Sequence, residues 1–156
     1  MRNREDPQTM ARAYAEILQN EEPWIALGNF MNAWFGYAKD CRAELVANPP
    51  VMPEGCSLTL KRWAVFIAAS VEWLCQKYAV PCPAWVHDSC YQLSEPWWYS
   101  VNADHPAVRA QLMDTTPEPF QRRNIYCGDR IYNNKYELDD LVAKIKEIRA
   151  RKGAQV

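Results

Sequence analysis

The chain has 156 residues, of which 49% are hydrophobic and 24% charged, and its formal net charge is −1 at pH 7. This length fits one domain with a sizeable core, and the composition excludes a disordered chain. The near-zero net charge gives the molecule as a whole no attraction to nucleic acid or to anionic membranes. We therefore expect one globular domain over residues 1–156.

Neither a targeting segment nor a membrane span is expected. The first residues are charged and contain no apolar stretch of the kind that secretory signals have. The most apolar run, residues 63–75, is interrupted by Glu72 and is shorter than the about 20 residues that cross a bilayer. These features predict a cytoplasmic protein that does not enter the membrane, with its six cysteines present as free thiols.

Helical patterns dominate the first third of the chain. Asp6 followed by Pro7 is typical of a helix start and predicts a helix that ends near Gln19. Pro23 predicts the start of a second helix, and the prolines at 49 and 50 end this helix or a short third one.

The most regular helical pattern lies between Ser57, which suits the N-cap position, and about residue 78. Its apolar residues recur every three to four positions: Leu60, Trp63, Ala64, Ile67, Val71, Leu74 and Tyr78. Phe66 and Trp73 lie beside this stripe, so the apolar face covers much of the circumference. A helix of this kind is expected at the centre of the core.

The rest of the chain predicts a connector, two short helices and a final helix. The connector spans residues 80–100 and is rich in proline and tryptophan. Short helices follow at 104–114, capped by Asp104, and at 115–124, and residues 125–132 have some strand character. Asn134 and Glu137 resemble a capping box before a final amphipathic helix, whose stripe is Leu138, Leu141, Val142, Ile145 and Ile148.

These elements predict the all-α class. The expected architecture is a single-domain, irregular helical bundle around one long buried helix at about residues 57–78, with the proline- and tryptophan-rich connector at 80–100.

A zinc site in the connector is considered and not favoured. The candidate ligands are Cys82, His87 and Cys90, with Cys75 on the preceding helix. Their spacings of six, four and two intervening residues include no CxxC pair of the kind that structural zinc sites use. We therefore expect free thiols and neither a metal nor another cofactor.

Enzyme chemistry has little support in the sequence. A cysteine nucleophile needs a base that holds it as a thiolate, and the chain has two histidines, His87 and His105. Nothing in the sequence orients either one toward a cysteine. No glycine-rich loop of the kind that binds phosphate is present. No catalytic residue is assigned, although a small cysteine-dependent enzyme stays open as an alternative.

Nucleic-acid binding is the second alternative. Residues 120–152 contain nine Lys or Arg and five Asp or Glu, among them Arg122, Arg123 and Arg130, which alternate with Tyr126 and Tyr132. Such a region can contact phosphates and bases. The basic end of a helix is, however, also favoured by the helix dipole alone.

Protein binding is the favoured function class, because aromatic and arginine side chains are the usual anchors of protein interfaces. We expect Trp85 and Trp97 to lie in the core and Trp98 and Tyr99 to be more exposed. The predicted partner-binding residues are Trp97, Trp98, Tyr99, Arg122, Arg123 and Tyr126.

Residues 60–130 resemble a pattern of small uncharacterised bacterial proteins. In that pattern a long helix ends in "VPxPAW", and "EPW", a short helix and "PxxFxRRNI" follow; the corresponding segments here are 80–85, 95–97 and 117–125. Such proteins are associated with toxin–antitoxin operons, beside a nucleotidyltransferase-like toxin of the abortive-infection class. The resemblance implies a bacterial antitoxin or accessory partner whose protein partner is a toxin encoded by the adjacent gene. It carries no catalytic residues over, and it does not extend to the tyrosine-rich segment 126–136.

Overall fold

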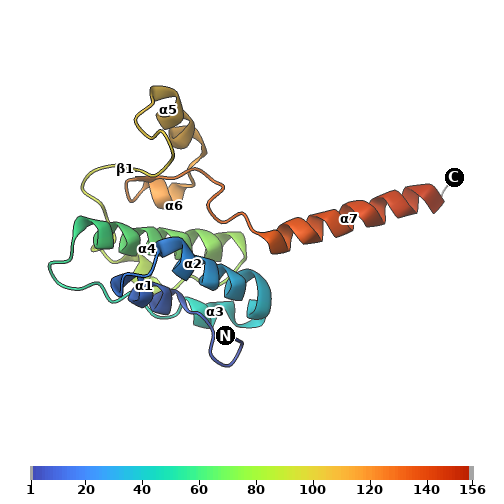
Figure 1. Ribbon diagram of the computed structural model, residues 1–156, viewed down its shortest axis with the longest axis horizontal. Helices are drawn as coiled ribbons and strands as arrows, with labels where there is room; N and C mark the ends of the chain where they lie inside the picture. The colour runs from blue at the N-terminus through green and yellow to red at the C-terminus, as the bar shows by residue number, and fades with distance from the viewer. Residues whose placement is uncertain (1, 155–156) are drawn as a thin grey trace.

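The structure is a computed structural model that describes residues 2–154, apart from the side chains of Asp139, Asp140 and Ala154. It is mainly helical, as the sequence predicts (Figure 1). The α-helices are α1 (Met10–Leu18), α2 (Pro23–Asn32), α3 (Arg42–Leu45), α4 (Leu58–Lys77), α5 (Pro106–Thr115), α6 (Glu118–Gln121) and α7 (Lys135–Ala154). The shorter elements are a π-helical turn η1 (Ala33–Tyr37), the 3-10 turns η2 (Lys39–Cys41) and η3 (Ala84–His87), and the strands β1 (Trp97–Trp98) and β2 (Ile125–Tyr126).

Two helix starts differ from the sequence prediction. Helix α1 begins at Met10, because the hydroxyl of Thr9 accepts the Arg12 amide proton and caps the helix three residues after Asp6. Asp6 instead forms ion pairs with Arg2 and Arg12. Helix α5 is capped by the imidazole Nδ1 of His105, and not by the predicted Asp104.

Helix α4 carries a large part of the core. The Ser57 hydroxyl accepts the Leu60 amide proton and caps the helix, and twelve residues from Trp63 to Cys75 are buried. The helix packs against α1, α6 and η3. Its buried Ser70 is bonded internally: the hydroxyl donates to the Phe66 carbonyl and accepts a 2.7 Å hydrogen bond from the buried Tyr132 hydroxyl.

The connector contributes a strand that the sequence did not reveal. Trp97 and Trp98 of β1 pair in parallel with Ile125 and Tyr126 of β2. The Trp97 amide donates to the Asn124 carbonyl at 2.8 Å, and the Tyr99 amide donates to the Tyr126 carbonyl at 2.9 Å. Strand character was predicted for residues 125–132, but a two-residue partner strand has no periodicity that a sequence pattern can detect.

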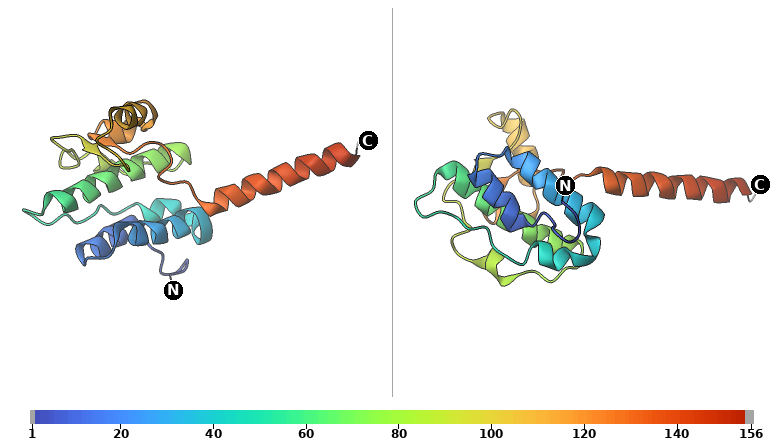
Figure 2. Two further views of the ribbon diagram at one scale, coloured as in Figure 1. Left: turned by 45° about the horizontal axis from the view of Figure 1, so that its top comes forward. Right: turned by 60° about the horizontal axis from the view of Figure 1, so that its bottom comes forward.

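Helix α7 extends away from the rest of the molecule (Figures 1 and 2). The predicted cap is present: the Asn134 side chain accepts the Glu137 amide proton at 2.9 Å and donates to the Glu137 carboxylate at 2.7 Å. The predicted apolar stripe is not covered, because Leu138, Leu141, Val142, Ile145 and Ile148 are 41–60% exposed. None of the helices described here combines the length and the hydropathy that a membrane span requires.

Candidate functional site

A stack of three side chains joins β1, β2 and α5. The ring of Trp98 lies flat against the ring of Tyr126, with centroids 4.3 Å apart and an interplanar angle of 18°. The guanidinium of Arg109 lies over the Trp98 ring at 4.9 Å. Trp98 and Tyr126 are both half-buried. We call these three residues the Trp98 stack.

Arg109 is held in place and still has free donors. Its Nε donates to the Ala103 carbonyl at 2.8 Å, and its Nη2 lies 3.5 Å from the Asp104 carboxylate. The side chain is 42% exposed. A guanidinium fixed in this way, beside two aromatic rings, is preorganised to meet a carboxylate or a further ring.

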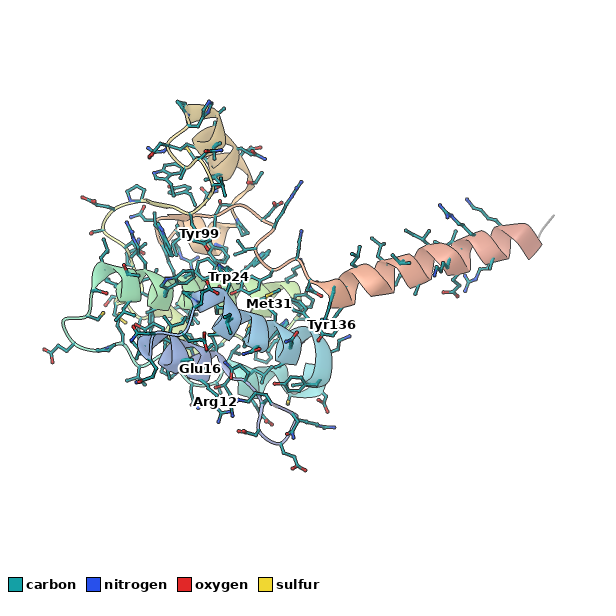
Figure 3. The ribbon with its side chains drawn as sticks, in the orientation of Figure 1. Arg12, Glu16, Trp24, Met31, Tyr99 and Tyr136 are labelled. Atoms are coloured by element: carbon teal, nitrogen blue, oxygen red, sulfur yellow. The ribbon has the colours of Figure 1, made fainter. Side chains whose placement is uncertain are left out.

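The neighbours of Trp98 along the strand point the other way. Successive side chains of a strand lie on opposite faces, so Trp97 and Tyr99 share the face that Trp98 does not occupy. Trp97 packs edge-to-face against Trp63 at 5.3 Å. The Tyr99 hydroxyl accepts a 2.6 Å hydrogen bond from the Trp24 indole of α2, and Figure 3 shows these two side chains close together. Both residues therefore fasten the strand to the core.

The predicted arginine pair lies in an ion-pair cluster at Glu72. Arg123 is 3% exposed; its Nη1 donates to the Glu72 carboxylate at 2.7 Å, and its Nη2 donates to the Val86 carbonyl at 2.7 Å. Arg122 binds the same carboxylate and also pairs with the exposed Glu118 at 2.9 Å. The donors of Arg123 are therefore used in buried contacts within the protein, and of the two arginines only Arg122 is exposed.

The pKa of Glu72 reflects this cluster. Burial raises the pKa of the carboxyl, but the hydrogen bonds and positive charges of Arg122 and Arg123 outweigh burial and hold the pKa below its ordinary value of 4.5. Glu72 is therefore ionised at neutral pH, and the cluster joins α4, η3 and the segment that leads into β2 through a charged contact.

The cysteine and histidine candidates do not form a site. Cys82, His87 and Cys90 are exposed, and among the side chains that the structure describes no three of His, Cys, Asp or Glu gather in a way that would hold a metal ion. Burial raises the pKa of Cys82, and it raises the pKa of Cys75 and of Cys127 to about 12. A reactive thiol needs the opposite shift, so these three are poor nucleophiles.

The accessibility of the thiols gives a prediction. We expect the exposed Cys90 to react first with a thiol reagent on the native protein, Cys82 to react more slowly because its pKa is raised, and the buried Cys75 and Cys127 to be protected. All six cysteines should titrate after denaturation without prior reduction, because none is bonded to another. A count below six after denaturation would reveal a disulfide or a tightly held metal.

The structure thus divides the six predicted binding residues. It brings Trp98 and Tyr126 together, turns Trp97 and Tyr99 toward the core, and places Arg122 and Arg123 on Glu72. Sequence reasoning missed Arg109, for which no sequence signal exists, because its position over Trp98 depends on how α5 packs. The opposite orientation of Trp98 and its neighbours follows only once residues 97–99 are known to be extended, because successive side chains of a strand lie on opposite faces.

No known family model matches the chain, and no curated protein or solved structure is significantly similar to it.

Proposed function

We propose that the protein is a non-enzymatic binding module that uses the Trp98 stack to bind another protein. The observation that carries the proposal is the stack itself: two half-exposed aromatic rings with an arginine fixed over one of them. Tryptophan, tyrosine and arginine are the residue types most enriched in interface hot spots. Three of them in contact at one surface are a ready anchor for a partner.

We further propose that the partner is the toxin of a bacterial toxin–antitoxin pair and that the complex forms in the cytoplasm. The support for this partner is the resemblance of residues 60–130 to small uncharacterised bacterial proteins that are associated with toxin–antitoxin operons. The binding module would cover the toxin's active site or substrate groove, with Trp98 and Tyr126 against apolar surface and Arg109 pairing with an acidic group. The buried Arg123 would keep the β1–β2 pair in place and would not touch the partner.

Substitutions at the stack test this proposal against the protein encoded by the adjacent gene. We expect Trp98→Ala and Arg109→Glu each to weaken binding by about 30-fold or more, because interface anchors contribute at least about 2 kcal/mol. Trp98→Phe keeps a ring on Tyr126 and should retain part of the affinity. The measurement is a titration by calorimetry, with the melting temperature of each variant recorded.

The matched control is Trp85→Ala. Trp85 is also half-buried and packs against Tyr91 at 5.5 Å, and its indole donates to the Val46 carbonyl. This variant should lose stability without losing affinity, which separates an interface role from a folding role. If Trp98→Ala and Arg109→Glu fold and bind as tightly as the wild type, the Trp98 stack is not the interface.

A second candidate function is nucleic-acid binding, and one observation favours it. The second half of α7 carries five basic side chains, all exposed: Lys144, Lys146, Arg149, Arg151 and Lys152. Binding of this kind would weaken steeply with salt, and Arg149→Glu would reduce the salt dependence. A protein complex that forms through Trp98 should keep its affinity and its salt dependence in Arg149→Glu.

A further inference from the structure

The exposed stripe of α7 is the largest unexplained apolar feature of the described residues. Five of the ten exposed large hydrophobic side chains lie on this one helix: Leu138, Leu141, Val142, Ile145 and Ile148. Their spacing of three and four residues puts them on one face over three turns. An aliphatic stripe of this length is ordinarily covered by another surface.

Contacts at the start of α7 hold the helix, and with it the stripe, away from the rest of its own molecule. The Tyr136 ring packs so closely on Gly36 that a Cβ atom at that glycine would lie 3.0 Å from it, and the Tyr136 hydroxyl donates to Asn32 at 3.2 Å. The Tyr78 hydroxyl donates to the Glu137 carboxylate at 2.7 Å. Figure 3 shows Tyr136 at the point where α7 leaves the body. The covering surface must therefore come from another molecule.

The charges along α7 indicate which molecule that is. The first half of the helix, residues 135–141, has three acidic residues and one basic residue, whereas residues 144–152 have five basic residues and one acidic residue. In an antiparallel pair centred on residue 143, Glu137 of one copy lies opposite Arg149 of the other, beside the stripe. A parallel pair would instead set the two basic halves side by side, with Arg149 and Lys152 in line with the stripe.

Four of the five stripe residues lie symmetrically about residue 143; the fifth, Val142, has Lys144 at the matching position. In an antiparallel pair centred there, Leu138 lies opposite Ile148 of the second copy, and Leu141 lies opposite Ile145. The spacing of three, four and three residues is that of the apolar seam of a short coiled coil. Each contact occurs twice, as in any two-fold interface.

We propose that the protein forms a homodimer through an antiparallel pair of α7 helices. The stripe is short, so the interface is at the small end of specific interfaces, and we expect a dissociation constant of about 1–100 µM. The dimer would carry two Trp98 stacks, one on each body. The proposed dimer does not depend on the proposed function, because no residue of the Trp98 stack lies in the α7 interface.

Sedimentation equilibrium of the full chain under reducing conditions tests the dimer, because the reductant prevents disulfide-linked pairs through the exposed Cys82 and Cys90. The wild type should change from monomer to dimer between about 1 and about 300 µM. Ile145→Glu should raise the dissociation constant at least 100-fold, since the change places two carboxylates in the apolar seam. The matched control is Ala150→Glu, which adds the same charge on the opposite side of the same exposed helix and should leave the dimer intact.

Salt distinguishes the two orientations. Raising the ionic strength from about 50 mM to about 500 mM screens surface charges and should weaken an antiparallel dimer. A dimer that tightens with salt would be parallel and would overturn the proposed arrangement. A wild type that stays monomeric at the highest concentration, or a dimer that survives Ile145→Glu, would overturn the use of the stripe altogether.

Discussion

Replacing Glu72 with glutamine should lower the free energy of unfolding by about 3–5 kcal/mol, one of the largest effects expected for a single polar substitution in this protein. The new side chain has nearly the same size, but one of the two oxygens that accept from Arg122 and Arg123 becomes an amide NH2 donor, so the change removes the charge and at least one accepted hydrogen bond. It leaves the Arg123 guanidinium 3% exposed without a counter-charge. Urea denaturation at pH 7 gives the measurement.

The chain offers a matched control in Glu118→Gln. Glu118 pairs with Arg122 but is 68% exposed, whereas the side chain of Glu72 is 5% exposed. Exposed ion pairs contribute between about 0 and 1 kcal/mol, so this variant should unfold almost like the wild type. Equal losses for the two variants would show that the Glu72 cluster is not buried in the way the structure describes.

The pH dependence follows from the lowered pKa of Glu72. A carboxyl whose pKa is lower in the folded protein adds stability above its unfolded pKa, and this stability is lost as the pH falls through the folded value. The difference between the wild type and Glu72→Gln should therefore be full at pH 7 and shrink as the pH falls below the ordinary value of 4.5. A difference that stays constant down to pH 3 would mean that the glutamine acts through packing instead of charge.

Replacing Trp63 with alanine should cost about 3–5 kcal/mol, because the ring is large and nearly fully buried. Trp63 is 7% exposed and packs edge-to-face against Phe66, Trp97 and Tyr99 at 5.4, 5.3 and 5.7 Å. The truncation removes these contacts and leaves a cavity between α4 and β1 that neighbouring rings fill only in part. Thermal and chemical unfolding give the loss in stability.

Leu58→Ala on the same helix is the control for Trp63→Ala. Leu58 is 59% exposed, so its truncation should change stability by no more than about 0.5 kcal/mol. A loss below about 1 kcal/mol for Trp63→Ala would contradict the position of α4 under the β1–β2 pair. A loss of the expected size would support the packing described here, in which Trp97 and Tyr99 anchor β1 to α4 and leave Trp98 on the other face of the strand.

Glu72→Gln and Trp63→Ala should affect the Trp98 stack as well as the stability of the fold. Glu72 and Trp63 both lie on α4; one holds the arginines that precede β2, and the other packs under β1. The Trp98 stack exists because these two short strands meet in register, with Trp98 opposite Tyr126. Damage to either support should therefore weaken partner binding indirectly, together with a lower melting temperature, whereas Arg109→Glu should weaken binding alone.

Several features of this protein follow from residues that are close in the sequence. The helical class, the Ser57 cap of α4, the start of α2 at Pro23 and the Asn134 cap of α7 were all predictable, and the structure contains them. Caps and helical periodicity depend on backbone groups within about four residues, so a local pattern is enough to predict them. The start of α1 was missed by three residues because Asp6 and Thr9 are both good caps, and a local pattern does not rank them.

The roles of the aromatic and arginine side chains were decided by the tertiary structure. From the sequence Arg123 is expected at the surface, because its counter-charge Glu72 lies 51 residues earlier in the chain. Trp98 finds its stacking partner Tyr126 across a parallel strand pair, and Arg109 reaches it from a separate helix. The stripe of α7 has the pattern of a core helix, yet its root at Tyr136 directs it into solvent. Such partners are chosen by packing between distant segments, and a residue's own neighbours in the sequence do not encode which distant surface it will meet.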